Sequence, residues 1–128
     1  MHLGYVIIYV ENVVATVKFY AAAFGLKQKF LHESNQYAEM HTGQTVLAFA
    51  GEKFIQSAYP FQTNRLAKQA AGAEVAFVVK DVEKSFTKAV DSGAIVVLKP
   101  SKKPWGQTVS HVRDNNGFIV ELCSPVSS

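Results

Sequence analysis

The chain has 128 residues, of which 48% are hydrophobic and 18% are charged, which excludes a disordered protein and suffices for one domain with its own core. The single cysteine, Cys123, excludes an internal disulfide and fits a reducing compartment. The formal net charge is +3, but the lysines are scattered over strand and loop patterns, which favours solvated loops over a nucleic-acid surface. No apolar run approaches the roughly 18 residues of a membrane-spanning helix, and no secretory segment precedes the first strand pattern. We therefore expect a cytoplasmic protein without a membrane or nucleic-acid partner.

Two segments of the chain share one pattern. Residues 5–13 lie over residues 74–82 at a constant offset of 69 (74 minus 5). Each segment begins with a β-branched and aromatic run that is typical of a strand. Each then reaches Asn12 or Asp81, residue types that accept backbone N–H groups at the start of a helix. The repeat predicts that each half of the chain begins with a strand and a helix.

The expected helices follow directly. Apolar residues recur at helical spacing from Val13 to Phe24, and Gly25 is suited to a left-handed cap that ends the helix. In the second copy the same spacing runs over residues 82–90, before Gly93. Each helix should therefore bury one apolar stripe.

Three strand candidates come after each helix, joined by short hairpin turns such as Asn116-Gly117. They cover residues 26–32, 36–42 and 45–50 in the first copy, and 95–99, 108–113 and 118–124 in the second. The repeat unit is therefore βαβββ, and we expect an α+β fold in which two such modules form a curved mixed sheet around a central cavity. In this interpretation residues 1–128 are one domain: module one is about 1–51, the connection about 52–72 with at most a short helical turn, and module two about 73–125.

Alternation of side chains across each strand predicts which residues meet the helices. The helix-packed face should be apolar, with Val6, Ile8 and Val10 matched by Val75, Phe77 and Val79. The opposite face is mixed: it carries Tyr5, Ile7, Tyr9 and Ala48 from the first copy, and Glu74, Ala76, Ile119, Glu121 and Cys123 from the second. Isolated carboxylates among apolar residues indicate either a pocket with convergent polar groups or a solvated sheet edge.

The motifs that carry a family resemblance lie at both ends of the chain. They are Val10-Glu11-Asn12-Val13 with Phe19-Tyr20 and Phe24-Gly25-Leu26, and Pro104-Trp105-Gly106-Gln107 with Asp114-Asn115-Asn116-Gly117-Phe118-Ile119-Val120-Glu121-Leu122. In this order and spacing the whole chain resembles the vicinal-oxygen-chelate superfamily, the glyoxalase, bleomycin-resistance and extradiol-dioxygenase group. The family turn usually reads Asp-Pro-Asp-Gly-Asn, whereas this chain has Asp114-Asn115-Asn116-Gly117-Phe118, a departure that keeps the turn.

The resemblance implies paired modules, often dimers, and a metal held from the first and fourth strand of each module. Those positions are Tyr5, Ala48, Glu74 and Glu121, and only Glu121 matches the commonest family pattern. Ala48 has no ligand atom, and a phenol with a pKa near 10 is a poor ligand at neutral pH. We therefore expect no metal cofactor of the usual kind, although two carboxylates could hold a hard ion such as Mg²⁺ weakly.

The histidines do not change this expectation. His2, His32 and His41 fall before or near the ends of strands, as surface residues do. His111 shares a strand face with Val109, which we predict to be the helix side or the rim, so His111 is not expected to be a ligand.

Two functions compete. The first is metal-independent binding of a small molecule in a pocket lined by Tyr5, Ile7, Tyr9, Ala48, Glu74, Trp105, Gln107 and Glu121, where two carboxylates would suit an amine or hydroxyl group. The second is a metal-dependent lyase or isomerase resembling glyoxalase I, in which Glu121 or Glu74 is the catalytic base next to a carbonyl. Thiol chemistry at Cys123 is disfavoured, because a neighbouring carboxylate raises a thiol pKa. The resemblance also predicts a homodimer.

Overall fold

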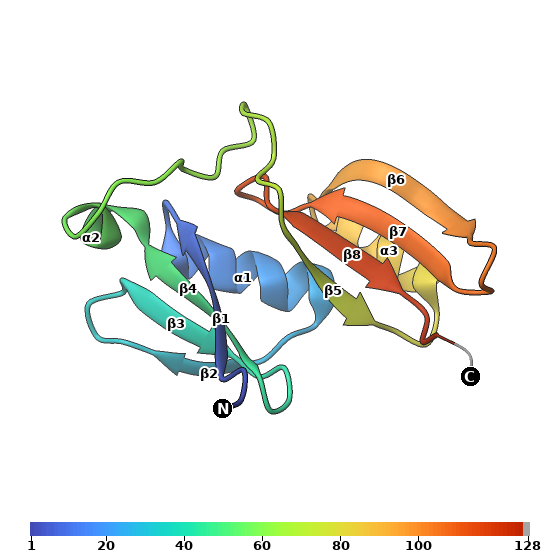
Figure 1. Ribbon diagram of the computed structural model, residues 1–128, viewed down its shortest axis with the longest axis horizontal. Coiled ribbons are helices and arrows are strands. Elements are labelled where there is room, and N and C mark those ends of the chain that lie inside the picture. The colour runs from blue at the N-terminus through green and yellow to red at the C-terminus, as the bar shows by residue number, and fades with distance from the viewer. Residues whose placement is uncertain (127–128) are drawn as a thin grey trace. The chain divides into compact units, whose positions relative to one another are not determined.

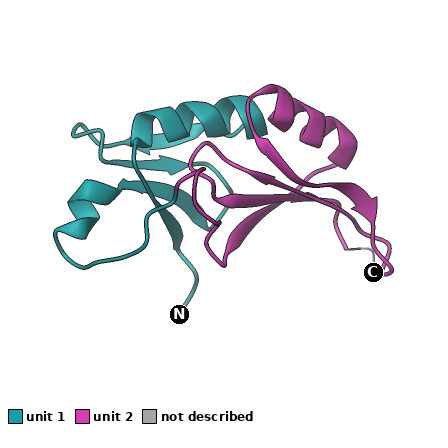
Figure 2. Cartoon of the chain, turned by 90° about the horizontal axis from the view of Figure 1, so that it is seen from above, with its two compact units in different colours: residues 1–64 teal, residues 65–128 magenta. Residues whose placement is uncertain are grey.

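The computed structural model describes residues 1–126; residues 127 and 128 lie outside the described part. The chain forms two compact units, Met1–Asn64 and the part from Arg65 onward, coloured separately in Figure 2. Each unit holds a four-stranded mixed sheet with one long helix on it (Figure 1). The α+β class and the two βαβββ modules predicted from the repeat are confirmed. Within residues 1–126, no helix has both the length and the apolar character that crossing a membrane requires.

Unit 1 has the strand order β1-β4-β3-β2, in which β1 is parallel to β4 and the other neighbours are antiparallel. Its elements are β1 (Tyr5–Val10), α1 (Val13–Phe24), β2 (Gln28–Leu31), β3 (Tyr37–Met40), β4 (Val46–Gly51) and the short helix α2 (Glu52–Gln56). The predicted helical turn in the connection is thus α2, which directly follows β4.

Helix α1 begins and ends where the sequence predicts. The Asn12 side chain accepts a hydrogen bond from the Ala15 N–H at 2.9 Å, and Gly25 has a left-handed φ of 68°. Between them Tyr20 is fully buried, with its ring centroid 4.7 Å from that of Phe49 on β4. The helix-facing side of this sheet is therefore the core of unit 1.

Unit 2 repeats this topology with the order β5-β8-β7-β6, in which β5 is parallel to β8. Its elements are β5 (Glu74–Val78), α3 (Val82–Asp91), β6 (Ile95–Lys102), β7 (Thr108–Arg113) and β8 (Ile119–Cys123). Asp81 caps α3 by accepting from the Lys84 N–H at 3.1 Å. The helix-facing side buries Val112, Val120 and Leu122, all at most 2% exposed.

Strand β6 runs three residues beyond the predicted end at Lys99. It is an edge strand with register shifts between Val96 and Leu98 and between Leu98 and Ser101. Because Pro100 lies within the second irregularity, its missing N–H interrupts no regular ladder. The strand predicted from the sequence ended just before this proline, whereas the pairing with β7 continues to Lys102.

The turn between β7 and β8 is held by its first residue. Asp114 is fully buried, and its carboxylate accepts from the N–H groups of Asn116 at 2.7 Å and Phe118 at 2.9 Å. Gly117 has a φ of 89°, and a Cβ there would lie 2.7 Å from the carbonyl oxygen of Arg65. Two separate constraints therefore require glycine at this position.

Arg113 ties the segment before β5 to this hairpin. Its guanidinium donates to the carbonyl oxygens of Gly117 at 2.8 Å, Arg65 at 3.1 Å, Leu66 at 3.2 Å and Lys68 at 2.7 Å. Four acceptors on one rigid fork fix the path of residues 65–68.

Candidate functional site

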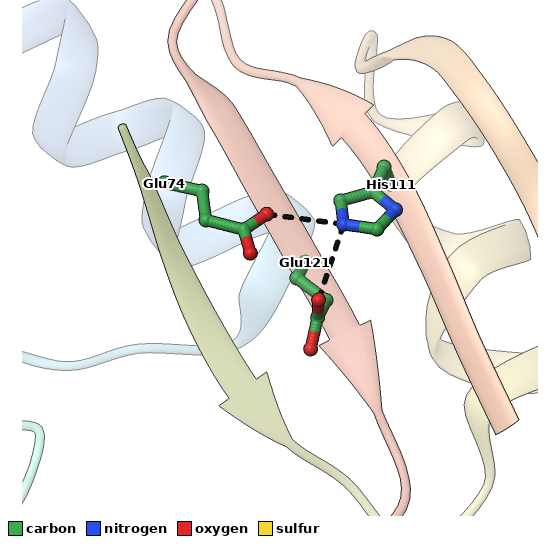
Figure 3. Close-up of side chains that lie close together, drawn as sticks. All are labelled: Glu74, His111 and Glu121. Atoms are coloured by element: carbon green, nitrogen blue, oxygen red, sulfur yellow. Dashed lines mark ion pairs between the residues drawn. The ribbon is translucent and has the colours of Figure 1, made fainter. Parts of the chain in front are cut away.

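We define the open face of each sheet as the side opposite its helix. On the open face of unit 2, three neighbouring strands bring together Glu74 from β5, His111 from β7 and Glu121 from β8 (Figure 3). His111 and Glu121 are direct partners in the β7–β8 register. Glu74 begins β5, and two residues later Ala76 pairs with Glu121. The parallel and antiparallel ladders thus place all three on one surface.

One ring nitrogen lies between the two carboxylates. His111 Nε2 is 3.0 Å from Glu74 Oε2 and 3.1 Å from Glu121 Oε1, and the three potential ligand atoms lie within 4.8 Å of one another. The side chains of His111 and Glu121 are 20% and 17% exposed, whereas that of Glu74 is 41% exposed. The cluster is therefore half-buried, with Glu74 on its solvent side.

Both contacts require a proton on His111 Nε2. Carboxylates only accept hydrogen bonds, so a proton on Nε2 makes both contacts favourable. The other ring nitrogen, Nδ1, is buried and has no hydrogen-bond partner within residues 1–126.

The predicted face of His111 was wrong. His111 does share a face with Val109, but that face is the open side; Ser110 and Val112 point to the helix side and are fully buried. A signal for this was present in the sequence. Counting equal numbers of residues back from Asp114 and forward from Phe118, the ends of the turn, pairs His111 with Glu121 directly.

Cys123 lies on the same face but is inert. It is 3% exposed, and its thiol donates to the Phe77 carbonyl oxygen at 3.8 Å. Burial first, and then a hydrogen bond to Glu121 and its negative charge, raise the pKa of the Cys123 thiol to about 11. The thiolate required of a nucleophile is therefore suppressed at neutral pH.

Trp105 and Gln107, both predicted to line the pocket, lie at the other end of β7 from Glu74. The Trp105 indole N–H donates to Gln107 Oε1 at 2.8 Å, and Gln107 Nε2 donates to the Ser124 carbonyl oxygen at 2.9 Å. Both precede Thr108, whereas Glu74 pairs with Ile119, which is opposite Arg113. The exposed Trp105 ring does not join the Glu74–His111–Glu121 cluster.

The four predicted residues of unit 1 lie on its open face. Tyr5 and Ile7 are exposed, and Ala48 is fully buried between its register partners Ile7 and Glu39. The Tyr9 hydroxyl is hydrogen-bonded to that of Tyr59, and this bond is the main cause that raises the pKa of Tyr9. Tyr9 on β1 thus anchors Tyr59, which lies in the segment after α2.

Glu39 was missed by the sequence reasoning. It pairs with Ala48 on the neighbouring strand just as His111 pairs with Glu121 in unit 2. The Tyr37 hydroxyl donates to Glu39 Oε2 at 2.7 Å, and burial, then this bond, raise the pKa of Tyr37. Extending the repeat from the last strands to β3 and β7 would have found it.

The fold and the paired modules place the protein in a known class. A model of the Glyoxalase/Bleomycin resistance protein/Dioxygenase superfamily matches residues 2–122, so the chain belongs to this superfamily. The uncharacterized protein YraH of Bacillus subtilis (strain 168) is 24% identical over 115 residues, covering 88% of this chain and 90% of YraH.

Solved structures share the fold at lower identity. A glyoxalase-related enzyme from Fulvimarina pelagi matches with a TM-score of 0.82 at 18% identity, covering 98% of this chain and 88% of its own. TioX from Micromonospora sp. ML1 matches with a TM-score of 0.72 at 21% identity, covering 97% of this chain and 98% of its own. These likenesses establish the fold of this chain.

A metal expected from the resemblance fits the cluster only in part. One imidazole nitrogen and two carboxylate oxygens are suitable donors for a divalent transition metal. A histidine that binds a metal through Nε2 normally donates its Nδ1–H to a partner, however, and none is found for His111 within residues 1–126. The number and type of donor atoms therefore fit a metal, whereas the lack of a hydrogen-bond partner for His111 Nδ1 in the described part of the chain does not.

Proposed function

We propose that the protein binds a small molecule carrying an amine or hydroxyl donor on the open face of unit 2, without the usual metal of the superfamily. The single observation that carries this proposal is the position of His111 Nε2, 3.0 Å from Glu74 and 3.1 Å from Glu121. One N–H already holds the two carboxylates together at hydrogen-bond distance. In this proposal the Nε2 proton takes the place that a cation would have in other members of the superfamily.

The remaining carboxylate oxygens are the recognition groups. A carboxylate has about four lone-pair sites, of which the imidazole uses one on each side chain. Glu74, at 41% exposed, faces the ligand, while the more buried Glu121 strengthens any charge-assisted bond through its lower local dielectric. Exposed Ala76 and Val78 on the same strand add apolar surface beside this negative charge. An apolar molecule with an ammonium group matches both features.

His111 acts as a positioning residue in this proposal. Without its N–H, two carboxylates on adjacent strands would repel each other and turn toward solvent. The imidazole fixes their spacing, so their outer oxygens converge on one ligand group.

A second candidate rests on the three donor atoms within 4.8 Å. Glu74, His111 and Glu121 would hold a divalent ion, which when bound supplies Lewis-acid polarisation of a carbonyl oxygen. Glu121 or Glu74 would serve as the base that removes a proton from the carbon next to that carbonyl. This is the metal-dependent lyase or isomerase alternative.

The first test uses phenethylamine as the probe and phenylacetate as its anionic counterpart, each titrated by NMR into the intact protein. We expect saturable binding of the amine and about tenfold weaker binding in Glu121→Gln, a loss of about 1.4 kcal/mol. Glu83→Gln on α3 removes the same charge away from the cluster and should bind like the wild type. Equal affinity for amine and anion would contradict the proposal.

Metal content separates the two candidates. The protein is stripped with a chelator, reloaded with manganese, iron, nickel or zinc, and analysed by inductively coupled plasma mass spectrometry. We expect substoichiometric retention. One ion per chain that is lost in both His111→Ala and Glu121→Ala would overturn the metal-independent proposal in favour of the second candidate.

We also propose a homodimer, supported by the family resemblance. Sedimentation velocity at micromolar concentration should give the mass of two chains. A monomer at that concentration would contradict it.

A further inference from the structure

Unit 1 contains a cavity of about 380 Å³ that the proposed function does not use. One wall is the open face of the sheet, where Tyr37 on β3 and Ala50 on β4 are register partners. A second wall is helix α2, with Ile55 and the 69% exposed Phe54. The volume lies within the range of small-molecule sites, roughly 300–1,000 Å³.

The third wall is the hairpin between β2 and β3, which is braced by hydrogen bonds within it. His32 Nδ1 accepts from the Ser34 N–H at 3.0 Å, which places the proton of the neutral ring on Nε2. Ser34 Oγ in turn accepts from the Gln36 N–H at 3.1 Å. These bonds make the hairpin a preformed wall.

The position of Gln36 is also fixed from the other side. Gly51 lies at the start of α2, and its N–H donates to the Gln36 carbonyl oxygen at 2.8 Å. A Cβ at Gly51 would collide with the Gln36 side-chain amide. The absence of a side chain at Gly51 therefore lets the Gln36 amide line the cavity beside α2.

The lining determines the class of ligand. It contains two aromatic rings, two aliphatic side chains, and the neutral polar groups of His32, Ser34 and Gln36, but no Asp, Glu, Lys or Arg. A charged molecule would lose hydration here without gaining an opposite charge. Flat rings gain stacking and edge contacts with Phe54 and Tyr37. We infer that this cavity binds a neutral aromatic small molecule, with the hairpin supplying its polar contacts.

The inference is independent of the cluster in unit 2, and the test keeps them apart. Indole is the probe, with indole-3-acetate as the charged comparison, titrated into the intact ¹⁵N-labelled protein. We expect saturable shifts at the amides of Tyr37, Ala50, Phe54 and Ile55 with indole, and none with indole-3-acetate. Glu121→Gln should leave the indole titration unchanged.

Two variants probe the cavity itself. Ala50→Leu fills it, and Phe54→Ala removes an exposed ring without touching the core; each should weaken indole binding about tenfold or more, equivalent to about 1.4 kcal/mol. Ala21→Leu, on the exposed side of α1, is the matched control. Absence of saturable shifts, or undiminished binding in Phe54→Ala, would overturn the inference. A third outcome would also overturn it: indole leaves the wild-type spectrum unchanged, and Phe54→Ala converts a dimer into a monomer. The apolar surface around Phe54 would then be a subunit interface.

Discussion

The two units share one topology but differ in the chemistry of their open faces. At equivalent positions, unit 2 carries Glu74, His111 and Glu121, and unit 1 carries Tyr5, Glu39 and Ala48. In unit 2 two carboxylates share one imidazole, whereas in unit 1 the single carboxylate accepts from Tyr37. The repeat of the backbone therefore keeps equivalent positions on the open face of each sheet. The residue types at those positions decide whether a polar cluster forms. Four predictions test how far this asymmetry extends.

The largest effect is expected at Gly117 in the hairpin of unit 2, and Gly43 in the hairpin of unit 1 is its comparison. Gly117→Ala must adopt a φ of 89° and press its methyl group against the Arg65 carbonyl, so we expect a loss of at least about 2 kcal/mol in the free energy of unfolding. Gly43→Ala in unit 1 has a φ of 97° but no atom within 4 Å of the new Cβ, and should lose only about 1 kcal/mol. Urea denaturation measures both. Equal losses would show that the contact with Arg65 is unimportant.

The second largest loss of stability is expected when Arg113 is replaced. Arg113→Ala removes donors to four carbonyl oxygens, and we expect about 2 kcal/mol of destabilisation, since bonds to a charged group contribute about 1.5–3 kcal/mol and the freed carbonyls become hydrated. His41 is the corresponding exposed residue of unit 1, and His41→Ala should stay within about 0.5 kcal/mol of the wild type. Thermal unfolding of both variants checks the order. A neutral Arg113→Ala would mean that residues 65–68 are held by other contacts.

The imidazole between the carboxylates should contribute less, because the cluster is partly solvated. His111→Ala leaves Glu74 and Glu121 without their shared donor, and we expect about 1 kcal/mol of destabilisation at neutral pH. The double variant Glu121→Gln with His111→Ala should recover part of this loss because one negative charge is gone. If the single and double variants are equally stable, repulsion between the carboxylates is negligible.

The smallest effect at neutral pH concerns Cys123. Its pKa is raised to about 11 in the folded protein, above the ordinary value of 9.0, so the neutral thiol is the favoured form. This contribution to stability is fully present below pH 9 and is lost as the pH rises through 11. Iodoacetamide should label the native protein slowly at pH 8, and Glu121→Gln should lower the thiol pKa. Rapid labelling at pH 8 under native conditions would contradict the burial of the thiol.

Much of the fold was predictable because short-range signals agree with the repeat. The helix caps Asn12, Asp81 and Gly25 and the constant offset between the copies all indicated the same modules, and each was confirmed. Strand ends were less predictable, since Pro100 stops a propensity pattern but does not stop the pairing of an edge strand.

The candidate site was only partly predictable, for a different reason. Glu74 and Glu121 stood out because charges are rare within apolar strands. His111 and Glu39 did not, since a single strand does not reveal which of its faces meets the helix. That information comes from register, and for His111 the turn from Asp114 to Phe118 contains it. The site residues on β3 and β7 are therefore the ones that pattern reasoning missed.

The bond chain from Trp105 through Gln107 to the Ser124 carbonyl gives the molecule a built-in optical reporter. Trp105 is the single tryptophan of the chain and belongs to unit 2, where its indole is tethered to the end of β8. Its fluorescence follows the release of that last strand, while unit 1 contributes to the circular dichroism but not to the tryptophan signal. Coincident curves from the two signals would mean that the units melt in one cooperative step, and separated curves that each melts by itself.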